Sequence, residues 1–232
     1  MHRITSASAA DLFDIAATRR IEQAAASALP PHALMQRAGL AAARLAMALA
    51  PHARTIWIAC GPGNNGGDGF GAAAQLRHRG FFPVVTFVGA EGRLPADAKA
   101  SLQRARDAGV TFASQPPSSF ELAMDALLGI GSTRPPSGTM AEWLARMHAS
   151  ASPVLSIDVP SGLDADTGML ASNTDQASAS VRTTLTFLTL KPGLLTAQGR
   201  DAAGTVWFDD LGCSAFAQEQ PTARLAGTPS IQ

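Results

Sequence analysis

The chain has few of the residues that define several common protein classes. It contains only two cysteines, Cys60 and Cys213, which are far apart and form no CxxC or cysteine–histidine array. This excludes a disulfide-stapled scaffold and a zinc finger, and it fits a reducing compartment. Eighteen basic side chains balance eighteen acidic ones. Because no net positive charge attracts nucleic acid or anionic lipid, we expect neither a nucleic acid nor a membrane as partner.

Long hydrophobic runs are also absent. The stretch 38–51 is rich in alanine but interrupted by Arg44, and it is shorter than the roughly 20 residues that a membrane helix requires. Residues 1–11 lack the basic start and apolar block of a secretory signal. The chain of 232 residues is nevertheless 46% hydrophobic and only 16% charged, which is enough apolar material for a large core. We therefore expect a folded protein of the cytoplasm.

Short apolar runs alternate with helical patterns along most of the chain. The predicted strands cover residues 55–60, 84–88, 110–113, 122–127, 154–159, 183–190 and 204–208. The predicted helices cover residues 9–29, 32–49, 68–79, 95–108 and 140–149. Strands separated by helices of this length indicate crossover connections and a mainly parallel sheet covered on both faces. The predicted fold is a three-layer α/β/α Rossmann-like sandwich, with about eight strands and two N-terminal helices.

Two further expectations concern the end of the chain. Gly199 and Gly204 flank the last connection, which we interpret as a hairpin-like turn. Residues 1–212 are expected to form one domain. Residues 213–232 turn to Ala, Gln, Pro, Thr and Ser without periodicity, so they are expected to form a tail or a truncated linker.

The first polar cluster, GPGNNGGDG at 61–69, directly follows the strand at 55–60. Ligands of open parallel sheets bind beyond the carboxyl ends of the strands. The run satisfies GxGxxG, which alone is weak evidence, and no GK[ST] follows, so a kinase-type P-loop is excluded. For Asn65 we favour a ligand role over a plain turn role, because the run exceeds what a turn demands. For Asp68 we favour a helix cap over a ligand role.

The second cluster is DALLGIGSTRP at 125–135. Asp125 lies in an apolar strand, where a carboxylate is costly unless it is paired or binds a cation. The loop Gly129–Pro135 offers free amides, two hydroxyls and Arg134, which together could cradle a phosphate. The alternative is a surface loop with Asp125 turned to solvent.

The third cluster is SIDVPSGLD at 156–164, again a buried strand that runs into a tight turn. Asp158 closes the strand, which is the right location for a catalytic or hydroxyl-binding carboxylate. In the alternative interpretation Asp158 only accepts backbone hydrogen bonds from the turn.

Together the clusters predict a site made of oxygen donors. Asn65, Asp125 and Ser161 offer one carboxylate among neutral oxygens, without sulfur or imidazole, and this set suits K⁺ better than Mg²⁺. The five histidines fall on helices, termini or linkers, and Cys60 is most simply a small buried residue. Lys191, after the strand at 183–190, would either reach a phosphate or cap an exposed sheet end.

These motifs, with LM at 34–35, RAG at 37–39, TF at 186–187 and KPGL at 191–194, resemble the NAD(P)H-hydrate epimerases, the YjeF N-terminal domain family. The resemblance covers nearly all of residues 8–212 and rests on four ordered motifs at compatible spacing. It implies an isomerase of metabolite repair, which interconverts the R and S forms of NADHX and NADPHX. It also implies a homodimer through the two N-terminal helices and a fused or separate ADP- or ATP-dependent dehydratase.

The resemblance carries site residues with it. It implies that the hydrated nucleotide contacts Asn64, Asn65, Gly66, Gly67, Asp68, Gly129, Ile130, Gly131, Ser132, Thr133, Arg134, Pro135 and Asp158. It implies one K⁺ per subunit, held by Asn65, Asp125 and Ser161. Asp158 is our hypothesis for the proton shuttle. Two rival functions are a non-catalytic nucleotide-binding or scaffold protein of the same fold and a Rossmann oxidoreductase, for which Glu91 would have to bind the ribose.

Overall fold

The computed structural model describes residues 1–132, 134–171, 181–214 and 219–227. Its helices are α1 (Ile15–Ala28), α2 (Ala33–Leu49), α3 (Asn64–His78), α4 (Ala96–Asp107), α5 (Thr139–Ala149) and α6 (Gly199–Ala203), with the 3-10 turns η1 (Glu91–Arg93) and η2 (Pro192–Leu194). Its strands are β1 (His2–Arg3), β2 (Ala10–Leu12), β3 (Thr55–Cys60), β4 (Phe82–Phe87), β5 (Thr111–Ala113), β6 (Leu122–Ala126), β7 (Val154–Ile157), β8 (Arg182–Phe187), β9 (Thr205–Asp209) and β10 (Ala223–Leu225).

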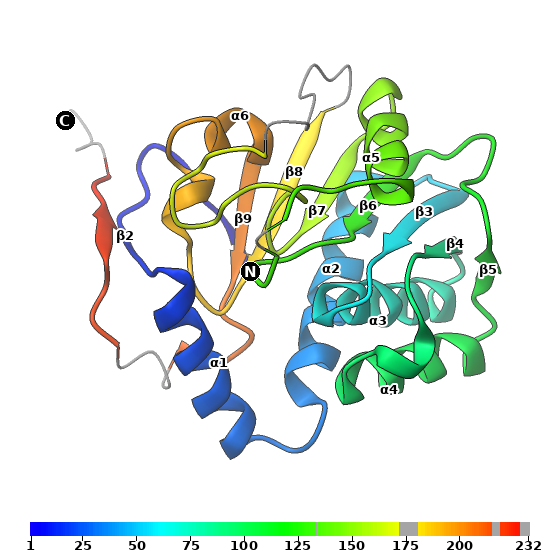
Figure 1. Ribbon diagram of the computed structural model, residues 1–232, viewed down its shortest axis with the longest axis horizontal. Coiled ribbons are helices and arrows are strands. Elements are labelled where there is room, and N and C mark those ends of the chain that lie inside the picture. Colours follow the sequence, from blue (N-terminus) through cyan, green and yellow to red (C-terminus); the bar gives the residue numbers. More distant parts are fainter. Residues whose placement is uncertain (133, 172–180, 215–218, 228–232) are drawn as a thin grey trace.

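Eight strands form one sheet in the order β1-β9-β8-β7-β6-β3-β4-β5, as Figure 1 shows. All neighbours are parallel except β1, which runs antiparallel to β9. The predicted hairpin-like turn before β9 is wrong, because β8 and β9 are parallel and α6 lies between them. Parallel strands need a crossover connection, whereas a hairpin joins antiparallel ones. The mainly parallel sheet of the prediction is confirmed.

The residues of β3 divide between two helical layers. Ile56 and Ile58 pack with α2, α3 and α4 in the largest core, while Trp57 and Ala59 pack with Trp143 of α5 on the opposite face. Neighbouring side chains of a strand point to opposite faces, so a strand that is apolar throughout is typical of a sheet covered on both sides. This confirms the three-layer arrangement.

The N-terminal segment and the end of the chain differ from expectation. The predicted helix 9–29 begins only at Ile15, after Asp14 accepts the capping hydrogen bond from the Ala17 amide at 2.7 Å. Before it, β2 pairs antiparallel with β10, the red strand set apart from the main sheet in Figure 1. Part of the expected tail is therefore a strand. The sequence did not reveal it because its pairing partner lies more than two hundred residues away.

The direction of the sheet's growth changes at β3. The chain adds β4 and β5 on one side of β3 and then returns to add β6 to β9 on the other. Such a switch point leaves a crevice at the carboxyl ends of the two central strands, where ligands of this fold class bind. The segments that follow β3 and β6 are the first two polar clusters of the sequence. Among the described helices, none is long and apolar enough to cross a membrane.

Candidate functional site

A cleft of about 710 Å³ lies at the carboxyl ends of β3, β6 and β7. Its lining includes segments from the three predicted clusters, 62–65, 127–132 and Asp158, and it also includes α1, the connection from α1 to α2, and Lys191. This volume is within the range typical of small-molecule and cofactor sites. The three clusters, separated by up to about a hundred residues, therefore meet at one cavity.

The glycine-rich turn lets α3 begin against the end of β3. A Cβ on Gly61 would lie 1.8 Å from the Leu127 carbonyl oxygen, and one on Gly66 would lie 2.0 Å from the Gly61 carbonyl oxygen. A Cβ on Gly67 would similarly meet the Met35 side chain of α2. These glycines are required for close packing. From this segment the cleft is lined by Asn64, Asn65 and Asp68, but not by Gly66 or Gly67.

Asp68 does not cap α3, so that interpretation is wrong. The cap position is Gly63, no side chain bonds the first turn, and Asp68 lies one turn further along. Its carboxyl lines the cleft, where burial raises the pKa of Asp68 well above its usual range and the Asp158 and Glu22 carboxyls raise it further. Burial, followed by the charge of Asp158, also raises the pKa of Glu22. Two cleft carboxyls are thus favoured in the neutral form.

Glu22 was not identified from the sequence as a site residue. It lies on α1 and lines the cleft. In the sequence it reads as an ordinary polar position of an amphipathic helix, and only the packing of α1 over the sheet end brings it to the site.

Asp125 and Ser161 are in direct contact. The Ser161 hydroxyl donates to Asp125 Oδ1 at 2.6 Å and the Ser161 amide donates to Oδ2 at 2.9 Å. Asp125 is only 2% exposed, so the alternative that it turns to solvent is wrong. Burial raises the pKa of Asp125, and the bonds from Ser161 partly offset the shift. The Leu128 amide in turn donates to the Ser161 hydroxyl at 2.9 Å, which fixes the start of the loop after β6.

Asn65 is a buried side chain with unmet hydrogen-bonding capacity. Both its amide nitrogen and its amide oxygen are buried without a hydrogen-bond partner within the described ranges. Gly129, at the start of the loop after β6, lies beside it, since a Cβ there would be 3.6 Å from the Asn65 oxygen. An orphaned amide oxygen beside a loop that the buried Asp125–Ser161 pair anchors fits a weakly charged hard cation. The described residues contain no cluster of three His, Cys, Asp or Glu that could hold a metal.

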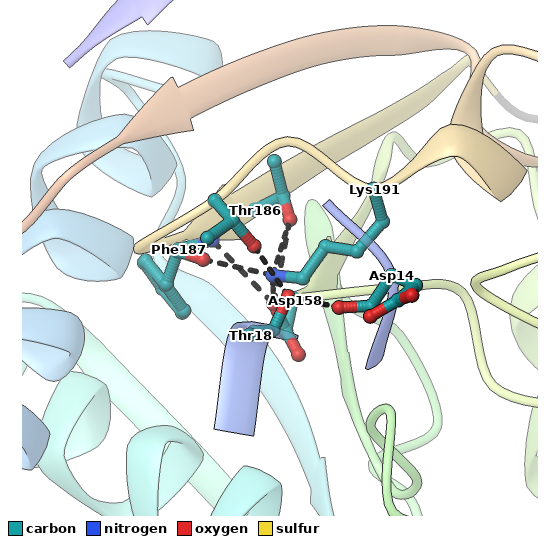
Figure 2. Close-up of polar contacts among 7 residues, drawn as sticks. Asp14, Thr18, Asp158, Thr186, Phe187 and Lys191 are labelled. Carbon is teal, nitrogen blue, oxygen red and sulfur yellow. Dashed lines mark hydrogen bonds and ion pairs between the residues drawn. The ribbon is translucent and has the colours of Figure 1, made fainter. Parts of the chain in front are cut away.

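Asp158 follows β7 and adopts a left-handed backbone conformation, with φ 65°. Lys191 reaches it from the segment after β8, and its Nζ donates to Asp158 Oδ1 at 2.6 Å (Figure 2). Lys191 is only 1% exposed. It therefore does not cap an exposed sheet end, and that expectation is wrong. The Asp158 carboxylate takes its hydrogen bonds from Lys191 and β8, and none of those found in the described part of the chain comes from the turn that follows it.

The loop after β6 reaches the cleft with only its first half. Gly129, Ile130, Gly131 and Ser132 line the cavity. Arg134 and Pro135 are exposed and lie outside the lining, and Thr133 lies outside the described residues. The nucleotide contacts predicted for these residues stay predictions.

Two residues considered in the sequence have different outcomes in the structure. His32 lies in the connection from α1 to α2, as its sequence position predicts, and it also lines the cleft, where it pairs with Asp97 of α4. Cys60 is fully buried, and burial raises the pKa of its thiol well above its usual range. Such a thiol is a poor nucleophile, which agrees with the packing role expected for it.

Comparisons with known proteins agree with the motifs. A family described as YjeF-related protein N-terminus matches residues 31–193. An NAD(P)H-hydrate epimerase of Rhodobacter capsulatus is 41% identical, and the match covers 65% of this chain and 76% of the relative. An NAD(P)H-hydrate epimerase of Weissella koreensis is 33% identical over 79% of this chain and 82% of the relative.

A longer relative and one solved structure add to this. The bifunctional NAD(P)H-hydrate repair enzyme Nnr of Escherichia coli is 36% identical over 88% of this chain, which spans only 40% of that enzyme. The crystal structure of yeast ynu0, YNL200c, superposes with a TM-score of 0.68 at 18% identity, covering 91% of this chain and 95% of the yeast chain. At that identity the likeness establishes the fold alone.

Proposed function

Because the chain belongs to the YjeF-related N-terminal family, we propose that it is an NAD(P)H-hydrate epimerase that interconverts the R and S forms of NADHX and NADPHX. The main support is the set of relatives named as epimerases, which this chain matches at 33–41% identity over most of their length. The cleft at the switch point supplies a cavity in which a nucleotide of this class could bind.

Epimerisation at C6 requires proton transfer and no change of oxidation state. The hydrated nicotinamide carries a hydroxyl at C6 beside the ring nitrogen. When that hydroxyl takes up a proton it leaves as water, the nitrogen lone pair forms an iminium ion, and water then adds to either face and loses a proton. One proton is taken up and one is released. We assign the transfer to Asp158, which lines the cleft and is 15% exposed.

We further propose that one K⁺ binds at Asn65, Asp125 and Ser161. The support is the orphaned Asn65 amide together with the single buried carboxylate. A K⁺ ion there would supply positive charge beside the nucleotide's phosphates. Asn64–Asp68, the loop 129–135 and Asp158 would contact the nucleotide itself.

The partners are proposals too. Bifunctional repair enzymes of Escherichia coli and Leishmania braziliensis include a region similar to this chain. We propose that a dehydratase, fused or separate, consumes the product. We also propose a homodimer through α1 and α2 and a cytoplasmic location.

The test starts from pure S-NADPHX in potassium buffer. The purified chain should speed its conversion to the mixture of S and R forms, followed by chromatography, and Asp158→Asn should slow it by about 100-fold or more. Tight binding of NADPHX without acceleration would favour the scaffold alternative. If the chain neither binds NADPHX nor accelerates its conversion, the proposal is overturned. The oxidoreductase alternative has less support, because Glu91, its ribose-binding residue, is ion-paired with Arg106.

A further inference from the structure

Lys191 is a buried cation whose hydrogen bonds are complete. Its Nζ donates to Asp158 Oδ1 at 2.6 Å, to the Phe187 carbonyl oxygen at 2.8 Å and to the Thr186 hydroxyl at 3.0 Å (Figure 2). An ammonium group has three protons, so each is matched to an acceptor of the protein. Lys191 thus has no proton directed at a ligand, although it lies at the wall of the cleft.

The other partner of the ion pair is bonded on one side only. All hydrogen bonds to the Asp158 carboxylate within the described residues end on Oδ1, from Lys191, the Thr186 hydroxyl and the Phe187 amide. Oδ2 has no such bond in the same set. The backbone is also fixed, because the Asp158 amide donates to the Leu185 carbonyl oxygen at 2.7 Å. One carboxylate oxygen is therefore held in place and the other is left available.

The acidic surroundings of Asp158 explain why this carboxylate needs a neighbouring cation. Asp158 stands near the Glu22 and Asp68 carboxyls, whose pKa values its charge helps to raise. Lys191 is the cation that counters this cluster, and it lowers the pKa of both neighbours. Without it, the Asp158 carboxylate would lie in a partly buried site with no paired cation.

We propose that Lys191 is a positioning residue of the epimerase: it fixes Asp158 through Oδ1 so that Oδ2 carries the transferred proton. The carboxylic acid form gives this proton to the C6 hydroxyl, which leaves as water, and the resulting carboxylate takes one proton back from the water that adds to the ring. This inference rests on the proposed function. It assigns Lys191 a role other than phosphate contact, because its protons are already used. A misplaced catalytic group commonly costs about 100-fold in rate even when the substrate still binds.

The first test compares Lys191→Met with Lys99→Met. These are the two lysines of the chain, and Lys99 is exposed on α4. We expect Lys191→Met to lower kcat by about 100-fold with KM nearly unchanged, since the loss is of orientation and not of substrate contact. Lys99→Met should match the unmodified chain. A Lys191→Met protein that raises KM at constant kcat would overturn the positioning role and indicate substrate contact.

The second readout is chemical rescue, which a purely structural role would not produce. In Lys191→Ala, added propylammonium should restore part of the activity by replacing the ammonium group beside Asp158, and propanol should not. Rescue by both compounds alike, or by neither, would overturn the proposal.

Two further measurements apply if Lys191→Met does not fold or if the unmodified chain is inactive. If Lys191→Met does not fold, Thr186→Val removes one acceptor at nearly constant shape and should lower kcat several-fold with KM unchanged. Lysine labelled with ¹³C at Cε gives two NMR signals, and Asp158→Asn should shift that of Lys191 but not that of Lys99. An unmoved Lys191 signal would overturn the pairing. Inactivity of the unmodified chain, with the Lys191 signal shifted as expected, would count against the proposed function instead.

Discussion

Two buried polar clusters at the same end of the sheet differ in how completely they are bonded. Around Lys191, three donors meet three acceptors. Around Asn65, the amide nitrogen and oxygen are both buried without a partner in the described residues. An unsatisfied buried polar group costs about 1–3 kcal/mol, so a fold that retains one is expected to bind a ligand there. The complete cluster around Lys191 fixes the position of Asp158, whereas the incomplete cluster around Asn65 is suited to bind a ligand.

The largest effect on stability is expected where the complete cluster is broken. Lys191→Met leaves Asp158 with its charge unpaired and should lower the free energy of unfolding by about 3 kcal/mol. The double variant with Asp158→Asn should recover part of that loss, because no charge is then stranded. Urea unfolding of the two single variants and the double variant measures the coupling. Additive losses would mean that the two side chains act independently.

Removal of the buried Asp125–Ser161 contact should have the next largest effect. Ser161→Ala takes a 2.6 Å hydrogen bond from Asp125 and removes the acceptor of the Leu128 amide. We expect a loss of about 2 kcal/mol in urea unfolding. Ser137→Ala, at an exposed position, is the matched control. Equal stability of the two variants would show that Asp125 is held by other means.

The incomplete cluster should respond in the opposite sense. Asn65→Leu removes two unpartnered polar atoms, so in tetramethylammonium buffer the variant should be more stable than the unmodified chain by about 1 kcal/mol. In potassium buffer the order should reverse, because K⁺ stabilises only a protein that binds it. Thermal unfolding in the two buffers measures both effects. If the unmodified chain unfolds at the same temperature in both, the cation proposal is wrong.

The sequence predicted the Asp125–Ser161 contact better than the Lys191–Asp158 pair, for a physical reason. Asp125 and Ser161 lie at or just after the ends of apolar strands, and the carboxyl ends of parallel strands share one edge of the sheet, so topology alone brings these two residues together. Lys191 and Glu22 depend on which way a side chain turns. Lys191 could have pointed outward from the sheet end, and only the packing of η2 and β8 turns it inward to Asp158. Glu22 required the position of α1 over the cleft.

The elements of the fold also divide into those that the sequence predicted and those that it did not. Apolar runs predicted the strands of the parallel sheet, because burial on both faces is visible in each run by itself. The β2–β10 pair was missed, since three residues of mixed character become a strand only through a distant partner. The connection before β9 was misread because glycines mark a helix end as well as a turn. Gly204 is the residue after α6, with φ 61°.

A smaller effect should follow from a change at Asp68, which lines the cleft. Its raised pKa means that the folded state holds the proton more tightly than the unfolded state. The stability this contributes is full below the ordinary carboxyl pKa and is lost as pH rises through the folded value. Asp68→Asn should therefore raise Tm at pH 8, by roughly 2–4 °C for each kcal/mol regained, and give no gain at pH 4. Asp107→Asn, at an exposed position of α4, is the matched control.

The smallest effect is expected at an ion pair that differs from Lys191–Asp158 mainly in exposure. Arg224 of β10 contacts Asp11 of β2 at 2.9 Å, but the two side chains are 77% and 47% exposed. Solvent and salt screen such a pair, which contributes at most about 1 kcal/mol. Arg224→Ala should thus change urea unfolding by less than about 0.5 kcal/mol, with the backbone pairing of β2 and β10 retained. A loss as large as that of Lys191→Met would mean that exposure does not separate the two pairs, and that the charge itself holds the C-terminal strand in place.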